Sequence, residues 1–244
     1  MNKKILLFTI LSIILVKLSA QPSLDYWNNV RYFKITGGTV TPGPELSSTS
    51  EDGLFAQNGY QIGFDYNYMI AMGFGLGVNL EFDRFYFDEL AFLEYAQPDM
   101  YRIGSGYSST KFGLNALFNI PIIVSPEMFT FNLYVEGNAG LRGMSIPSID
   151  LYYDEVVNNF VEVSYRARSN TMGYLGYSAG VQLLFANKFG INVSYNAVVP
   201  SRHSIRYSVR KFDAAEELYE DEGYANNFLD HTGLQFGILF MFGK

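Results

Sequence analysis

The chain has 244 residues, with 17 Lys and Arg against 24 Asp and Glu, and a formal net charge of −7. This acidic balance argues against nucleic acid as a partner, and the lack of cysteine excludes a disulfide framework and a thiolate metal site. Aromatic residues, mostly Phe and Tyr, make up 17% of the chain, an excess typical of the aromatic girdles of membrane barrels.

The N-terminus has the three parts of an export signal. Two lysines near the start precede an apolar run from Ile5 to Val16, and small residues ending at Ala20 resemble a cleavage site. The apolar run is too short to span a bilayer as a helix. The sequence therefore predicts a signal peptide over residues 1–20 and one barrel domain over residues 21–244.

Eight later stretches alternate apolar residues with polar or small ones. This period of two places an apolar row on one face of a strand and a polar row on the other. In chain order the predicted strands cover residues 30–40, 58–69, 74–83, 111–120, 131–142, 175–185, 189–195 and 234–242. The connections alternate in length: short turns are expected at 70–72, 125–127 and 187–188, and long loops at 41–57, 88–108, 145–170 and 200–230.

One face of these strands suits lipid and the other suits water. In the third stretch, for example, Phe74, Leu76 and Val78 share one face while Gly75 and Gly77 share the other. A strand in hydrocarbon needs all its backbone groups paired, and among sheets only a closed barrel provides this. We therefore predict an all-β, transmembrane, antiparallel up-and-down barrel of eight strands, with short periplasmic turns and long extracellular loops, integral to the outer membrane of a Gram-negative cell.

Three local features carry a family resemblance. They are the Ala20-Gln21 junction, the hairpin formed by residues 118–123 (FNIPII) and 134–140 (YVEGNAG), and the terminal Phe240-Met241-Phe242. In these the chain resembles the eight-stranded outer-membrane barrels of Bacteroidetes known as PorT-like or OmpA-like β-barrel proteins. The resemblance implies an outer-membrane location and, for some members, a role in protein secretion and gliding-type export.

Six charged residues fall on the inward face of the predicted strands: Asp65, Glu81, Asp83, Lys111, Glu136 and Arg142. The interior of an eight-stranded barrel is only wide enough for its own side chains. We therefore interpret these residues as a network of ion pairs and hydrogen bonds that fills the lumen. The alternative is a lumen that conducts ions or binds a substrate.

Two segments keep a strand-like alternation beyond the membrane belt, at 160–170 and 203–212, and we expect them to extend above the membrane. Four arginines lie on their polar faces: Arg166, Arg168, Arg206 and Arg210. Guanidinium groups bind phosphates in a bidentate manner, so this cluster is a candidate contact for lipopolysaccharide. The alternative is that the arginines pair within the chain with the acidic run Glu216, Glu217, Glu220, Asp221 and Glu222.

Motifs for cofactors, metals and catalysis are weak in this chain. The acidic run lacks the glycine-punctuated spacing of a calcium loop and is better explained as a solvated loop. His203 and Ser204 are adjacent, but neighbours in a strand point to opposite faces, which disfavours a catalytic pair. His231 lies beside the same predicted loop. We expect no cofactor, no metal and no enzymatic activity.

Aromatic residues gather at the start of the second predicted long loop: Phe85, Tyr86, Phe87, Phe92 and Tyr95. They suit a contact with a protein or glycan, or packing over the barrel mouth, or the interfacial girdle. The leading interpretation is a non-enzymatic outer-membrane barrel that acts through its extracellular loops, or by docking to envelope proteins as an accessory of a secretion system, with outer-membrane lipid and lipopolysaccharide around it. The alternatives are a small-solute pore and a lipid-modifying enzyme.

Overall fold

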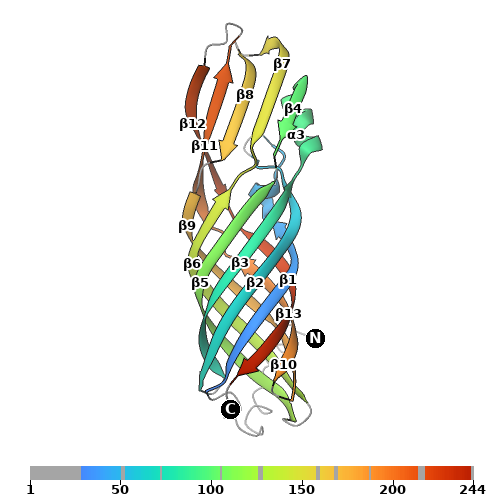
Figure 1. Cartoon of the computed structure of the whole chain (residues 1–244), viewed down its shortest axis with the longest axis vertical. Helices are drawn as coiled ribbons and strands as arrows, with labels where there is room; N and C mark the ends of the chain where they lie inside the picture. The colour runs from blue at the N-terminus through green and yellow to red at the C-terminus, as the bar shows by residue number, and fades with distance from the viewer. Residues whose placement is uncertain are drawn as a thin grey trace, which may run out of the picture.

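A computed structural model describes residues 29–50, 53–71, 73–104, 106–125, 129–157, 160–167, 170–186, 188–213 and 218–242. The predicted signal peptide lies outside these residues. Within them, eight strands form a closed antiparallel barrel in the order β1-β13-β10-β9-β6-β5-β3-β2 (Figure 1). The barrel strands are β1 (Arg31–Pro42), β2 (Ala56–Ala71), β3 (Phe74–Phe87), β5 (Tyr107–Ser125), β6 (Phe129–Ser145), β9 (Asn170–Phe185), β10 (Phe189–Val198) and β13 (His231–Phe242).

The first and last barrel strands pair with each other along their whole length. The register of β1 and β13 runs from Arg31 opposite Phe242 to Pro42 opposite His231. This pairing leaves the barrel without an open edge, which is the condition for strands to lie in hydrocarbon. The predicted eight-stranded closed barrel is confirmed, and its strands extend further at their extracellular ends than the alternation alone had indicated.

Side chains alternate between the outside and the lumen as the sequence pattern predicts. Leu114 is 67% exposed on the outer face, while its neighbour Asn115 is only 2% exposed inside. Phe112, Leu141 and Phe236 are also exposed on the outside. An apolar outer belt around a polar interior is the arrangement of a barrel that spans a membrane. No helix among the described residues is long and apolar enough to cross a membrane.

Much of the chain predicted as long loops is folded into a second sheet. Its order is β12-β11-β8-β7-β4, and it stands beyond the barrel at the end opposite the short turns (Figure 1). The sheet consists of β4 (Met100–Ile103), β7 (Ile149–Val157), β8 (Phe160–Ala167), β11 (Arg202–Phe212) and β12 (Leu218–Phe228). The strand-like alternation at 160–170 and 203–212 corresponds to β8 and β11, which pair with each other.

Two short helices lie at this end of the barrel, and α3 stands beside the second sheet, next to β4 (Figure 1). Helix α2 (Pro44–Ser47) begins with Pro44, and its Leu46 is fully buried. Helix α3 (Glu89–Ala96) begins after Asp88, whose side chain accepts a hydrogen bond from the Ala91 backbone N–H. A proline in the first turn and an aspartate cap both satisfy or remove donors that a helix start leaves free.

The barrel interior has an apolar cluster near each end. At the turn end, Tyr32, Met69, Leu117, Leu184 and Leu239 pack together with Val30. At the opposite end, the cluster joins barrel residues to α2 and the second sheet, and includes Val40, Leu46, Phe85, Tyr107, Ile205 and Leu229. Polar and charged side chains occupy the lumen between the two clusters. Each end of the lumen is thus filled by apolar packing.

Candidate functional site

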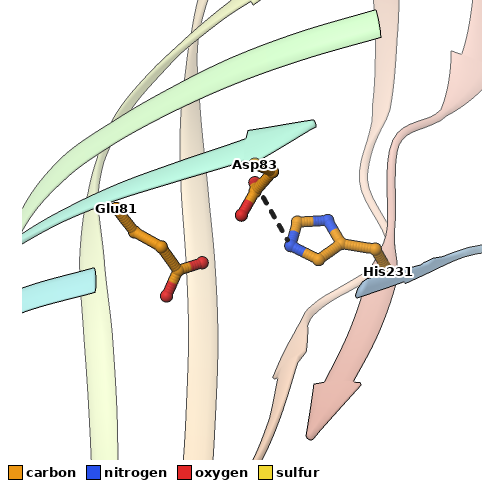
Figure 2. Close-up of side chains that lie close together, drawn as sticks. All are labelled: Glu81, Asp83 and His231. Atoms are coloured by element: carbon orange, nitrogen blue, oxygen red, sulfur yellow. Dashed lines mark ion pairs between the residues drawn. The ribbon is translucent and has the colours of Figure 1, made fainter. Parts of the chain in front are cut away.

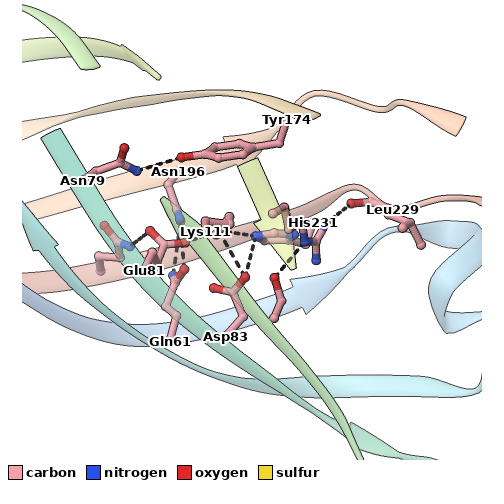
Figure 3. A network of polar contacts seen from close by, with 12 residues as sticks. Gln61, Asn79, Glu81, Asp83, Lys111, Tyr174, Asn196, Leu229 and His231 are labelled. Carbon is pink, nitrogen blue, oxygen red and sulfur yellow. Dashed lines mark hydrogen bonds and ion pairs between the residues drawn. The ribbon is translucent and has the colours of Figure 1, made fainter. Parts of the chain in front are cut away.

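Lys111 is the centre of the upper polar group in the lumen. Its ammonium group pairs with the Glu81 carboxylate, lies 3.2 Å from Asp83 Oδ2, and lies 3.0 Å from His231 Nε2. His231 Nε2 is in turn 3.6 Å from Asp83 Oδ2 (Figure 2). Figure 3 shows how these side chains from separate strands converge across the interior. Such dense pairing is what buried charges require to offset their desolvation.

The same three acceptor residues have the composition of a metal site. Glu81, Asp83 and His231 each offer one ligand atom, and these atoms lie within 4.8 Å of one another. The Lys111 ammonium group, however, already lies within contact distance of all three side chains and supplies a positive charge there. A cation would have to displace Lys111, so we interpret the group as an ion-pair network.

Lys34 organises a second polar group further down the lumen. Its Nζ lies 3.1 Å from Asp65 Oδ2 and 3.3 Å from Glu136 Oε2. Asn115 donates to Glu136 Oε1 over 3.2 Å. Lys34 is 3% exposed and Glu136 is 5% exposed, so this group is buried like the first.

Arg142 lies at the extracellular end of the lumen, where it contacts the apolar cluster that contains Leu229. It is 1% exposed, its Nε donates to Ser109 Oγ over 2.8 Å, and its Nη1 donates to the Leu229 carbonyl over 2.5 Å. The remaining cavity near Lys34 and Lys111 measures about 20 Å³, which is room for roughly one water molecule. Little free space therefore remains around these charged side chains.

The structure places all six predicted charged residues in the lumen and divides them among these three groups. Two further members, Lys34 and His231, were missed in the sequence. Lys34 alternates with Phe33 and Ile35 in the first predicted strand, so its inward position was readable. His231 lies between the loop predicted over 200–230 and the last predicted strand, which begins at Leu234. The alternation of Gly233, Gln235 and Gly237 with larger residues extends back to it.

A much larger cavity, of about 700 Å³, lies outside the barrel between its rim, the two short helices and the second sheet. We call it the extracellular cavity. From the rim and α3 it is lined by Phe55, Phe87, Phe92 and Tyr95. Phe55 and Phe92 meet edge to face, with ring centroids 5.4 Å apart. This volume falls within the range of small-molecule sites, about 300–1,000 Å³.

The second sheet contributes another aromatic pair to the extracellular cavity. Tyr165 of β8 and Tyr207 of β11 line it, with ring centroids 6.0 Å apart. Burial raises the pKa of the Tyr165 phenol, and the neighbouring Tyr207 acts in the same direction. Tyr165 therefore stays a neutral hydroxyl across the physiological pH range.

Polar side chains complete the lining of the extracellular cavity. They are Glu45, Ser48, Ser50, Arg202, Asn226 and Asn227. Arg202 Nη2 lies 3.9 Å from Glu45 Oε1, and Ser48 Oγ lies 2.7 Å from Ser50 Oγ. The cavity thus combines ring faces with hydrogen-bonding groups of both kinds.

Of the aromatic residues noted in the sequence, three line the extracellular cavity: Phe87, Phe92 and Tyr95. Phe85 instead points into the barrel, is fully buried, and lies with its ring centroid 5.5 Å from that of His231. Tyr86 is 56% exposed on the outer face. Phe87, Phe92 and Tyr95 therefore pack over the barrel mouth, whereas Tyr86 lies on the outer face.

The arginines predicted as a cluster have separate surroundings. Arg166 Nη1 lies 2.5 Å from Asp150 Oδ1, and Arg210 Nε lies 3.4 Å from Glu220 Oε1. The Arg206 guanidinium sits 5.8 Å from the centroid of the Tyr224 ring. Arg168 lies outside the described residues, as do Glu216 and Glu217.

Arg166, Arg206 and Arg210 occupy positions of β8 and β11 that alternate with Tyr165 and Tyr207. Arg166 and Arg210 therefore point away from the extracellular cavity, whereas Arg206 lies against the ring of Tyr224, a residue of the cavity lining. Burial acts to raise the pKa of Asp150, but hydrogen bonds from Arg166 and Ser164 outweigh it and hold that pKa below its usual range. His203, considered above with Ser204, lies instead with its Nε2 2.7 Å from Ser201 Oγ.

No protein-family model matches the chain, and no curated protein matches it in sequence. Solved structures do match. Neisserial surface protein A is similar with 11% identity and a TM-score of 0.49, covering 86% of this chain and 96% of that one. OprG from Pseudomonas aeruginosa has 15% identity and a TM-score of 0.43, covering 87% and 97%. Ail from Yersinia pestis has 12% identity and a TM-score of 0.42, covering 88% and 99%.

The location of the chain follows from its own architecture. A closed antiparallel barrel with an apolar outer belt, a polar interior, short turns at one end and long connections at the other is the membrane-spanning form found in outer membranes. The chain is an integral outer-membrane β-barrel protein.

Proposed function

We propose that this barrel is a non-enzymatic outer-membrane protein that binds a ligand on the outer side of the membrane, in the extracellular cavity. The observation that carries the proposal is the contrast in volume between the two cavities. About 700 Å³ is open outside the barrel, whereas about 20 Å³ remains in the polar lumen. A large concave site with aromatic walls and a few polar groups is the usual form of a small-molecule site.

The lumen argues against a small-solute pore. Lys34, Lys111 and Arg142 are each buried and each engaged by hydrogen bonds or ion pairs. Apolar clusters also pack near both ends of the lumen. Moving a solute through would require breaking these buried pairs, at a cost of several kcal/mol for each charge left alone (roughly 3–5).

The finer assignments rest on the sequence. On the resemblance of the 118–123 and 134–140 hairpin, we propose membership of the PorT-like or OmpA-like barrels of Bacteroidetes, and an accessory role in protein secretion. We also propose that lipopolysaccharide surrounds the second sheet near Arg166, Arg206 and Arg210. Arg206 is the best candidate for phosphate contact because its guanidinium is exposed and stacks on Tyr224.

Native mass spectrometry of the mature protein in detergent micelles tests the main proposal. The protein is screened against neutral oligosaccharides, sulfated oligosaccharides, fatty acids and aromatic amino acids. We expect at least one class to bind, and binding to be lost in Ala225→Trp, which places an indole ring in the extracellular cavity. Ala139→Trp on the lipid-facing side of β6 is the matched control. Binding by none of the four classes would overturn the proposal.

Planar-bilayer recording separates the proposal from the pore. The protein should give no steady conductance steps, and Ala225→Trp should behave in the same way. Regular single-channel steps from the wild-type protein would favour the pore instead.

A further inference from the structure

The extracellular cavity receives aromatic rings from two parts of the molecule. Phe55 and Phe92 come from the barrel rim and α3, and Tyr165 and Tyr207 come from the second sheet. A ligand in the cavity therefore meets ring faces or edges from more than one side. Such an arrangement favours a ligand that itself has flat apolar faces.

The polar side chains of the cavity offer donors and acceptors without a surplus of charge. Ser48 and Asn226 carry neutral hydrogen-bonding groups, and Glu45 and Arg202, the charged residues among the described lining, lie 3.9 Å apart. A ligand rich in hydroxyl groups can both donate to and accept from such a set.

Two other classes of ligand, anions and acyl chains, fit this lining poorly. An anion would find Arg202 already facing Glu45, and Arg206 lying against the ring of Tyr224. Arg166 and Arg210 point away from the cavity toward their own carboxylates. The chain as a whole carries a net charge of −7, which repels anions. An acyl chain would cover the serine and asparagine groups without giving them hydrogen bonds, which costs free energy.

We infer that the extracellular cavity binds a neutral oligosaccharide; this inference rests on the proposed function and names its ligand class. Sugar rings present apolar C–H faces that stack on Phe and Tyr, and hydroxyl edges that suit Ser, Asn, Glu and Arg. The volume of about 700 Å³ accommodates several sugar rings rather than one. The ligand is thus a short glycan chain outside the cell, lying between the aromatic rim and the second sheet.

The test uses the full mature protein in lipid nanodiscs and isothermal titration with maltotetraose, cellotetraose and chitotetraose as neutral probes. A heparin tetrasaccharide and palmitate serve as the sulfated and acyl probes. At least one neutral probe should bind. Tyr207→Ala should weaken that binding about tenfold, because a stacking ring is lost, and Tyr207→Phe should change it much less. The matched control is Tyr219→Ala, an exposed tyrosine of β12 outside the cavity lining, which should leave affinity unchanged.

The variants are compared only if they keep the difference in gel mobility between unheated and boiled samples that marks a folded barrel. Binding of palmitate or the heparin tetrasaccharide that Tyr207→Ala abolishes would overturn the inference while leaving the proposed function standing. Binding of a neutral probe that survives both Tyr207→Ala and Ala225→Trp would also overturn it, because the sugar would then bind elsewhere. Failure of all the neutral probes to bind is a third result that would overturn it.

Discussion

The lumen and the extracellular cavity arise from the same alternation of side chains, yet one is filled and the other is open. In the barrel, eight strands close on themselves, so inward side chains meet across a narrow interior and must pair. Lys111 pairs with Asp83, and Glu136 pairs with Lys34. The second sheet is open and stands over the rim, so its inward tyrosines face a gap. In the closed barrel the inward polar side chains pair with one another and stabilise the fold, whereas in the open sheet the inward side chains can contact a ligand.

Removing one positive charge from the lumen should give the largest loss of stability. Lys111→Met leaves Glu81 and Asp83 buried without their cation, and we expect a loss of about 3–5 kcal/mol in the free energy of unfolding. Urea unfolding in lipid vesicles measures it. Adding Asp83→Asn to Lys111→Met should recover part of the loss. A change below about 1 kcal/mol would show that the pairs are as weak as exposed ones.

A charge introduced on the outer face of the barrel tests whether that face contacts lipid. Val78 lies midway along the outward-facing row of apolar residues from Phe74 to Phe82, so Val78→Arg should cost about 2–4 kcal/mol. The matched variant Leu218→Arg, at an exposed position of the second sheet, should change stability by less than about 0.5 kcal/mol. The same unfolding assay compares them, and equal losses would place Val78 away from lipid.

The Arg166–Asp150 pair of the second sheet should respond to pH. The pKa of Asp150 is lowered in the folded protein, so its contribution to stability is present above the ordinary carboxyl pKa of about 4 and is lost as the pH falls below it. Amide hydrogen exchange in β7 and β8, corrected for intrinsic rates, should therefore speed up below about pH 4. Asp150→Asn should remove this pH dependence and cost about 1 kcal/mol at neutral pH. An unchanged profile in Asp150→Asn would assign the response to another group.

The smallest effect is expected for the exposed pair on the same sheet. Arg210 and Glu220 are each about half exposed in their side chains, so Arg210→Met should change stability by about 0–1 kcal/mol. Arg210→Met and Lys111→Met each remove the cation of an ion pair. The difference between their losses of unfolding free energy measures how much more an ion pair contributes when it is buried in the closed barrel. A loss from Arg210→Met as large as that from Lys111→Met would remove the distinction.

Strand alternation was enough to predict the barrel, because lipid and lumen impose a strict period of two on residues such as Leu114 and Asn115. The second sheet was harder to predict. The acidic run of β12 reads as a solvated loop, and β4 is only four residues long. β12 forms because β11 provides an edge for it to pair with, and β4 forms against the edge of β7. This is a tertiary effect that the local pattern does not contain.

The lumen network could be predicted from the sequence, but the extracellular cavity could not. The six lumen charges could be found by counting positions along each strand, and Lys34 and His231 obey the same rule. The extracellular cavity could not be found in this way. Its residues, such as Ser48, Phe92 and Tyr207, come from three separate connections whose relative placement depends on how the second sheet stands over the rim.

The apolar cluster at the turn end, with Leu117, Leu184 and Leu239, has a consequence for the cell that carries this protein. A second apolar cluster, with Val40 and Leu46, packs at the opposite end. We therefore expect an inserted copy to add surface outside the cell without opening a path for polar solutes across the membrane.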